Sequence, residues 1–101
     1  MTDLEITRLC AEAMGVTLLG KGTEAFGPSE HDGMLVTFPY NPLKIDAQAM
    51  ALVKKFRVLV GTDGELWTAF IPWGGRSIRN LNLNRAICEC VAKMQDAKAH
   101  A

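Results

Sequence analysis

The most informative hydrophobic pattern lies in residues 57–71, RVLVGTDGELWTAFI, where two β-rich runs flank Asp63 and Gly64. An Asp-Gly pair between such runs predicts a hairpin with a two-residue type I′ turn, in which Thr62 faces Glu65. Large apolar side chains then fall on both faces of the hairpin: Val58, Val60, Trp67 and Ile71 on one, and Leu59, Leu66 and Phe70 on the other. We therefore expect a sheet that is covered on both sides.

Apolar positions with a helical period predict an amphipathic helix near the N-terminus. Thr2 is the expected N-cap, and Glu5 completes a capping box three residues later. The helix is expected to run to about Met14, because Gly15 supplies the left-handed residue of a helix end.

Two further helices follow from the same period. One is expected from Asp46, as N-cap, to about Phe56. The other begins after a cap at Asn80 or Asn82, and the period is lost in residues 96–101, which we expect to fray.

The remaining elements complete an α+β fold with the order α-β-α-β-β-α. Residues 34–38, MLVTF, are expected to form a third strand beside the hairpin, and residues 17–19 are a further short candidate. Residues 21–33 are rich in glycine and proline and are predicted to be a loop, as are residues 72–77, PWGGRS. We expect one domain over residues 1–101, a three-layer α/β/α sandwich around a small, mainly antiparallel sheet. The pattern leaves open which two helices share a face.

Charge and composition exclude several classes of function. The 101 residues carry 11 basic and 11 acidic side chains, so no global field attracts a phosphate backbone or a membrane surface. No apolar run is long enough to span a bilayer, and residues 1–9 lack the layout of a signal peptide. Three cysteines, an odd number in helical patterns, favour free thiols in a reducing compartment. Together these features predict a cytoplasmic protein.

The cysteines and histidines do not form a recognisable catalytic or metal site. Cys88 and Cys90 lie two apart on a predicted helix and point about 200° away from each other, so they cannot share one metal ion. Cys10 and Cys90 are expected in the core, whereas Cys88 falls at the flank of its helix, where partial exposure is expected. His31, between two acidic residues in the predicted loop, is most simply a solvated turn. We expect no metal, no cofactor and no catalytic residues.

Trp73, Arg76 and Arg79 are the candidate residues for a ligand or partner surface. An aromatic ring beside two guanidinium groups could stack a base and hold a phosphate of single-stranded nucleic acid. The alternative is a flexible connection in which Trp73 folds back over the sheet edge. The zero net charge and the lack of an evident basic groove favour this second interpretation.

Three segments of the chain resemble a known family. The segments MTDLEITRLCAEAMG, YNPLKIDAQAMALVKKF and LNRAICECVAKM are similar to the phage ABA sandwich domain, found in small phage and prophage proteins. The resemblance implies helices on both faces of a sheet and a phage-related origin in a bacterial host. These segments are helix caps and core positions, so the resemblance carries over no active site.

The leading functional prediction is a noncatalytic accessory or interaction protein. Its partner is either an unknown protein or a second copy of the chain that pairs along an open sheet edge. One alternative is a single-stranded nucleic-acid-binding module. The other is a small enzyme, which would need a pocket that combines groups such as His31 with Cys88 or Asp46.

Overall fold

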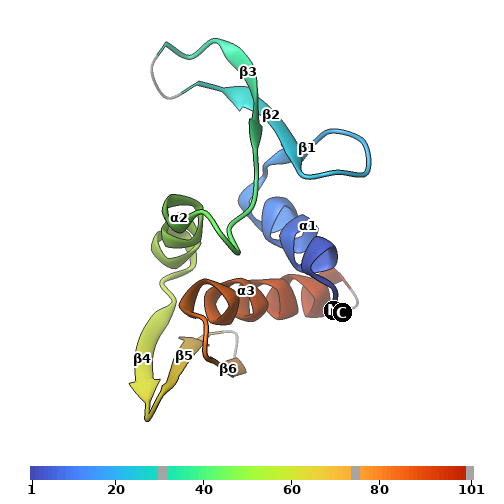
Figure 1. Cartoon of the computed structure of the whole chain (residues 1–101). Helices are drawn as coiled ribbons and strands as arrows, with labels where there is room; N and C mark the ends of the chain where they lie inside the picture. Colours follow the sequence, from blue (N-terminus) through green and yellow to red (C-terminus); the bar gives the residue numbers. More distant parts are fainter. Residues whose placement is uncertain (30–31, 74–75, 100–101) are drawn as a thin grey trace.

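The computed structural model describes residues 1–29, 32–73 and 76–99, with the side chain of Arg76 left out of the description. Three helices and two three-stranded antiparallel sheets alternate in the order α-β-β-β-α-β-β-β-α (Figure 1). The sheets have the strand orders β1-β2-β3 and β4-β5-β6. The elements are α1 (Asp3–Met14), β1 (Thr17–Leu18), β2 (Glu24–Pro28), β3 (Leu35–Pro39), α2 (Asp46–Phe56), β4 (Leu59–Asp63), β5 (Leu66–Ile71), β6 (Arg76–Asn80) and α3 (Leu83–Ala99). The fold is thus α+β and broadly an α/β sandwich, as predicted.

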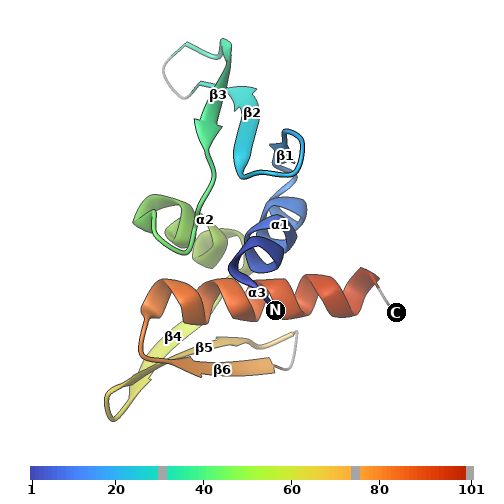
Figure 2. The ribbon, with the colours of Figure 1, turned by 45° about the vertical axis from the view of Figure 1, so that its right-hand side comes forward.

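Helix α3 is the central element of the molecule. One side of it packs on β5 and β6, and the other side packs on α1 and α2 (Figure 2). Helices α1 and α2 thus lie on the side of α3 away from the sheet β4-β5-β6, and the expected pair of helices on one sheet face is not formed. The sheet β1-β2-β3 follows α1 along the chain. Its main contact with the helices is the one between β1 and α1.

The number and pairing of strands differ from the prediction. Strand β3 pairs with β2 in a separate sheet and does not lie beside the hairpin of β4 and β5. Strand β2 falls within residues 21–33, which were predicted to be a loop, and β6 includes two residues of the predicted loop at 72–77. Glycine and proline lower the intrinsic strand preference of such segments, whereas pairing with a neighbouring strand supplies the backbone hydrogen bonds that override it.

The turn of the β4–β5 hairpin lies one residue later than predicted, which shifts every cross-strand partner by two residues. Asp63 pairs with Leu66, so that Gly64 and Glu65 form the two-residue turn. Gly64 has a φ of 64° while Glu65 does not have a positive φ. This combination suits a type II′ turn, which places glycine at its first central position. The predicted type I′ turn and its pairing of Thr62 with Glu65 were wrong, but a shift by two leaves every side chain on its predicted face.

Helix α3 covers one face of the hairpin sheet. Ala69, Ile71 and Ile78 on that face are buried. On the opposite face Leu59 is 58% exposed, and Leu66 and Phe70 are half-buried. The expectation of cover on both faces of this sheet was therefore wrong, because α1 and α2 pack on α3 and leave the outer face of the sheet open.

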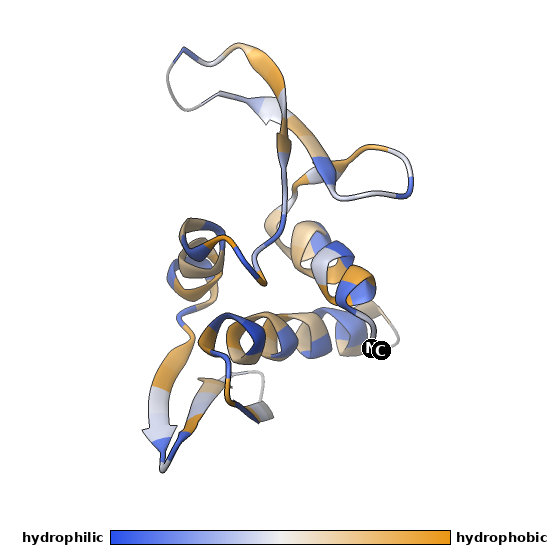
Figure 3. Ribbon diagram, viewed as in Figure 1, coloured by the Kyte–Doolittle hydropathy of each residue, from blue (hydrophilic) through white to orange (hydrophobic). Residues whose placement is uncertain are grey.

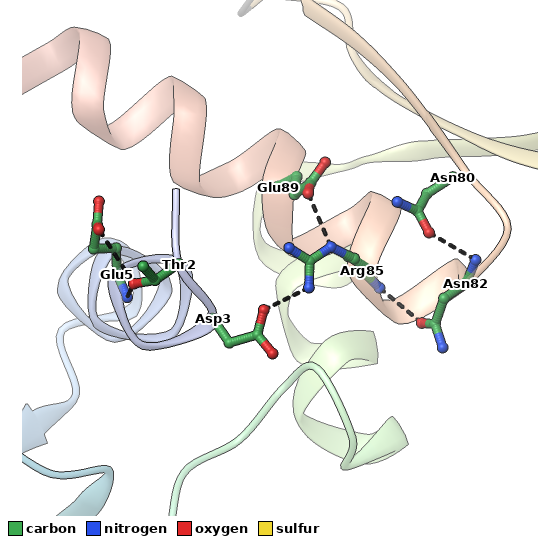
Figure 4. Close-up of polar contacts among 7 residues, drawn as sticks. All are labelled: Thr2, Asp3, Glu5, Asn80, Asn82, Arg85 and Glu89. Carbon is green, nitrogen blue, oxygen red and sulfur yellow. Dashed lines mark hydrogen bonds and ion pairs between the residues drawn. The ribbon is translucent and has the colours of Figure 1, made fainter.

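The ends of α1 confirm the sequence signals. The Thr2 hydroxyl accepts a hydrogen bond from the Glu5 N–H at 3.1 Å and donates to the Glu5 carboxylate at 3.2 Å (Figure 4). At the other end Gly15 has a φ of 71°, and the Val16 N–H reaches the Ala11 carbonyl at 2.8 Å. This is the Schellman geometry that a C-terminal glycine favours.

The ends of α2 and α3 agree only in part with those predicted from the sequence. Asp46 is the first helical residue and not the N-cap, which is Ile45 without a side-chain hydrogen bond. In α3 the Asn82 side chain accepts from the Arg85 N–H at 3.0 Å, so Asn82 is the cap (Figure 4). The helix continues to Ala99, which extends through most of the segment predicted to fray; residues 100–101 lie outside the described chain.

The core gathers around α3, and its burial corrects one expectation. Ile87, Cys88, Cys90 and Val91 are all at most 1% exposed. Cys88 was expected to be partly exposed at the flank of its helix. It is fully buried because α3 has packing partners on two opposite sides, which makes its buried arc wider than that of a helix with one covered face.

Candidate functional site

An apolar cleft of about 510 Å³ lies between the strands β2 and β3 and the helix α2. Its walls include Val36 and Phe38 of β3 and Ala47 and Ala51 of α2. We call this cleft the arm cleft, and we call residues 24–29 and 32–39 the arm. Its remaining lining residues are Met14, Val16, Pro28, Ser29, Tyr40, Ile45 and Gln48. The volume lies in the range of known ligand and partner pockets.

The polar groups around the arm cleft hold the arm in place. The Gln48 side chain donates to the Pro39 carbonyl at 2.8 Å and accepts from the Asn41 N–H at 2.6 Å. These two bonds tie the base of the arm to α2. None of the lining residues carries a charge. The chemistry of the cleft therefore suits an apolar group or an uncharged extended segment.

The far part of the arm exposes an unusual share of large apolar side chains. Met34 is 66% exposed, Leu35 is 65% exposed, and Val36 and Phe26 are about 40% exposed. Figure 3 colours much of this part of β3 as hydrophobic. Single exposed apolar residues are normal, but here three consecutive residues expose large apolar side chains, Met34 and Val36 on one face of the arm and Leu35 on the other. This makes the arm a candidate contact surface.

A small cluster of thiol and phenol groups lies in the core near the base of the arm. The Cys10 thiol donates to the Cys88 carbonyl at 3.4 Å. The pKa of the Cys10 thiol is raised, mainly by its contact with the Cys88 side chain and secondly by its burial. Burial likewise raises the pKa of Tyr40, whose hydroxyl is buried and has no partner among the described residues. With its pKa raised, the Cys10 thiol stays protonated near neutral pH and is a poor nucleophile.

The predicted surface at Trp73, Arg76 and Arg79 is divided between two sites. Trp73 is 62% exposed, and its ring centroid lies 6.4 Å from that of Phe56 at the end of α2. Arg79 lies on the outer face of the sheet and pairs with Asp63 at 3.3 Å, so its charge is already compensated. Arg76 pairs with Ile71 at the other end of β6, and its side chain lies outside the description.

Nucleic-acid binding at Trp73 would also need basic side chains nearby, and one of the two lysines at the end of α2 is already engaged. The Lys55 ammonium donates to the Ala13 carbonyl at 3.2 Å and lies 5.6 Å from the centre of the Phe56 ring. Lys54, on the same helix, is exposed. Nucleic-acid binding at Trp73 stays an untested prediction.

The groups suggested for an enzyme pocket do not meet in the described chain. Cys88 is fully buried in the core, whereas the exposed Asp46 accepts a hydrogen bond from the Asn84 side chain at 2.8 Å. His31 and Glu30 lie outside the described residues. Among residues 1–29, 32–73 and 76–99, no group of three or more histidine, cysteine or acidic side chains could hold a metal ion. Within the same residues, no helix has the length and apolarity to cross a membrane.

Arg85 joins the first turn of α1 to α3. Its guanidinium contacts the Asp3 carboxylate at 2.6 Å and the Glu89 carboxylate at 3.0 Å (Figure 4). The hydrogen bond to Asp3 is the main cause of the raised pKa of Arg85. The cluster is a partly buried structural link in which the Arg85 cation is already paired with two carboxylates.

Comparison of the chain with family models, curated proteins and solved structures finds no match. The functional argument therefore rests on the surfaces described above.

Sequence reasoning recognised β3 as a strand but did not find the arm cleft. The missed signal is the run from Gly33 to Leu43, which contains no charged residue although it borders a turn-rich loop. A strand with this composition inside a covered sheet would be ordinary. The pairing of β3 with β2, away from the main body of helices, is what makes its apolar side chains available.

Proposed function

We propose that this chain is a noncatalytic interaction protein of phage or prophage origin that acts in the cytoplasm of a bacterial host. The phage origin rests on the three segments that resemble the phage ABA sandwich domain, at residues 1–15, 40–56 and 83–94. The interaction role rests on the arm and its cleft. A binding protein needs a surface that fits its partner but no reactive group. The arm cleft offers an uncharged, mostly apolar surface of this kind.

The observation that carries the proposal is the exposed apolar strand beside an uncharged cleft. Met34, Leu35 and Val36 leave between 40% and 66% of their surface accessible. Burial of apolar surface in a contact is favourable by roughly 25 cal/mol per Å². The arm therefore favours association with an uncharged partner segment that covers β3 and enters the cleft.

A photo-crosslinking experiment tests this function. A photoreactive benzoylphenylalanine replaces Ala47 on the cleft wall, and in a control chain it replaces Leu81, which is 71% exposed and outside the cleft. On irradiation in bacterial cells, the chain with the probe at position 47 is expected to form discrete protein adducts. The control at position 81 is expected to form none of the same mass. Absence of adducts from position 47, or the same adducts from both positions, would refute the arm cleft as the interaction site.

A further inference from the structure

The backbone of β3 presents unpaired hydrogen-bonding groups at the free edge of its sheet. Strand β3 is the last strand in the order β1-β2-β3. The Ser29 N–H donates to the Met34 carbonyl at 2.8 Å, so the backbone of Met34 faces β2. In an antiparallel ladder every second residue of a strand directs both its N–H and its C=O to the same neighbouring strand, and the residues between direct theirs to the opposite side. Counting from Met34, the N–H and C=O groups of Leu35 and Thr37 therefore point away from β2, where no described strand pairs with them.

This edge lacks the usual protection against pairing. Natural proteins blunt open edges with lysine, other charges, proline or a bulge. Residues 33–43 contain no charge, so two copies of this segment do not repel each other. Pro39 is the last residue of the strand, and its carbonyl is already bonded to Gln48. The two residues that offer edge groups, Leu35 and Thr37, lie before it.

We propose that a second copy of this chain binds here, and that the two β3 strands pair antiparallel across a two-fold axis at Val36. Leu35 of each copy then lies opposite Thr37 of the other. This inference rests on the proposed function and names the partner of the same surface. An isologous contact of this kind is closed and makes a dimer, with a continuous sheet of six strands.

Hydrogen bonding selects this register. With Val36 on the axis, each of the two Leu35–Thr37 pairs exchanges two bonds, and all four edge groups of each copy are satisfied. A register centred on Thr37 would bring Leu35 opposite Pro39, which has no N–H to donate. A register centred on Leu35 would bring Thr37 opposite Gly33, beyond the start of the strand at Leu35. The Val36 register is the one that uses the whole free edge and avoids the proline.

The same register pairs the exposed side chains. Val36 meets Val36 of the second copy on the face that borders the cleft, in a pair without hydrogen bonds where side chains approach closely. Met34 lies opposite Phe38 of the second copy on that face, which brings a thioether to an aromatic ring. On the other face Leu35 lies opposite Thr37. Each exposed apolar residue at positions 34–36 thus acquires a partner.

The first test compares the native chain with the Thr37→Pro and Thr37→Ala variants by sedimentation equilibrium. Proline at position 37 removes an N–H that points out of the sheet, so it breaks no bond within one copy, whereas alanine keeps the N–H. We expect the native chain and the Thr37→Ala variant to reach twice the 11.0 kDa mass of one chain, and the proline variant to stay at one mass. A native chain that stays at one mass up to millimolar concentration, or a proline variant that still dimerises, would overturn the proposal.

The second test reads the register and does not depend on the proline variant. Cα atoms across a pair without hydrogen bonds lie about 4.5 Å apart, within reach of a disulfide. The Val36→Cys variant is therefore expected to form a disulfide-linked dimer under copper phenanthroline and air. The matched Thr37→Cys variant is expected to form none, because its two copies are diagonal, roughly 7–8 Å apart. The native cysteines are buried and do not compete. A dimer trapped through position 37 and not through position 36 would overturn the register.

These outcomes separate the inference from the proposed function. Adducts between the Ala47 probe and a foreign protein, together with one-chain mass in solution, would overturn self-pairing and leave the interaction role intact. Absence of any adduct from that probe would refute the arm cleft as the interaction site, whatever the mass in solution.

Discussion

Arg57 ends α2 in the left-handed region, with φ 54° and ψ 47°, and its replacement by glycine is expected to stabilise the protein. A side chain with a Cβ costs roughly 1–2 kcal/mol in this conformation. Glycine removes that strain but loses about 0.5–1 kcal/mol through the greater freedom of the unfolded chain. Taken near the centre of both ranges, the expected net gain for Arg57→Gly is about 0.5–1 kcal/mol. The Arg57 side chain is exposed and makes no hydrogen bond or ion pair with the described residues, so little else is lost.

Gly15 supplies a matched substitution of opposite sign. It ends α1 with a φ of 71°, and a Cβ built there meets no heavy atom within 4 Å. Gly15→Ala therefore introduces backbone strain without a steric clash, and the two terms of the Arg57 argument apply in reverse. We expect a loss of about 0.5–1 kcal/mol.

Urea and thermal unfolding followed by circular dichroism measure both effects. A change of 1 kcal/mol corresponds to about 4–8 °C for a domain of this size, so we expect shifts of roughly 2–8 °C, upward for Arg57→Gly and downward for Gly15→Ala. The Arg57→Ala variant is the control, since it removes the side chain but keeps the strain. Its stability should stay within about 0.5 kcal/mol of the native value. A midpoint that falls for Arg57→Gly, or an equal rise for Arg57→Ala, would refute backbone strain as the cause.

Two further predictions concern the core. Ile87→Ala should lower the free energy of unfolding by about 2–5 kcal/mol in urea titrations, because this side chain is 1% exposed between the helices and the sheet. The control Leu4→Ala, at a position 45% exposed, should change that free energy by less than about 0.5 kcal/mol. Equal effects of the two substitutions would contradict the packing. The free energy of unfolding should also fall as pH rises above 9.0, the ordinary pKa of a thiol. Above this pH Cys10 ionises in the unfolded chain. In the folded chain its contact with Cys88 and its burial keep the thiol protonated. The urea midpoint measured between pH 8 and 10.5 should fall less steeply for Cys10→Ala, and an unchanged slope would count against this coupling.

The sequence by itself determined the elements whose signals are local. The capping box at Thr2 and Glu5, the left-handed end at Gly15 and the asparagine cap of α3, which the sequence placed at Asn80 or Asn82, are interactions between residues a few positions apart. Local backbone geometry decides these features, so the chain can specify them without its tertiary contacts. The assignment of side chains to the two faces of the β4–β5 hairpin survived for a similar reason, since strand alternation tolerates a shift of two residues.

The tertiary structure alone decided which strands pair and which apolar faces are covered. Nothing local to Glu24–Pro28 predicts a strand, because its partner β3 supplies the ladder that offsets the cost of its glycine and proline. The apolar pattern likewise shows that Leu59 and Leu35 prefer to be buried, but not what buries them. In this chain α3 covers the inner face of one sheet, while the outer face of that sheet and the β3 edge of the other stay open. Periodicity states a preference for burial, and only the packing of distant segments assigns the partner.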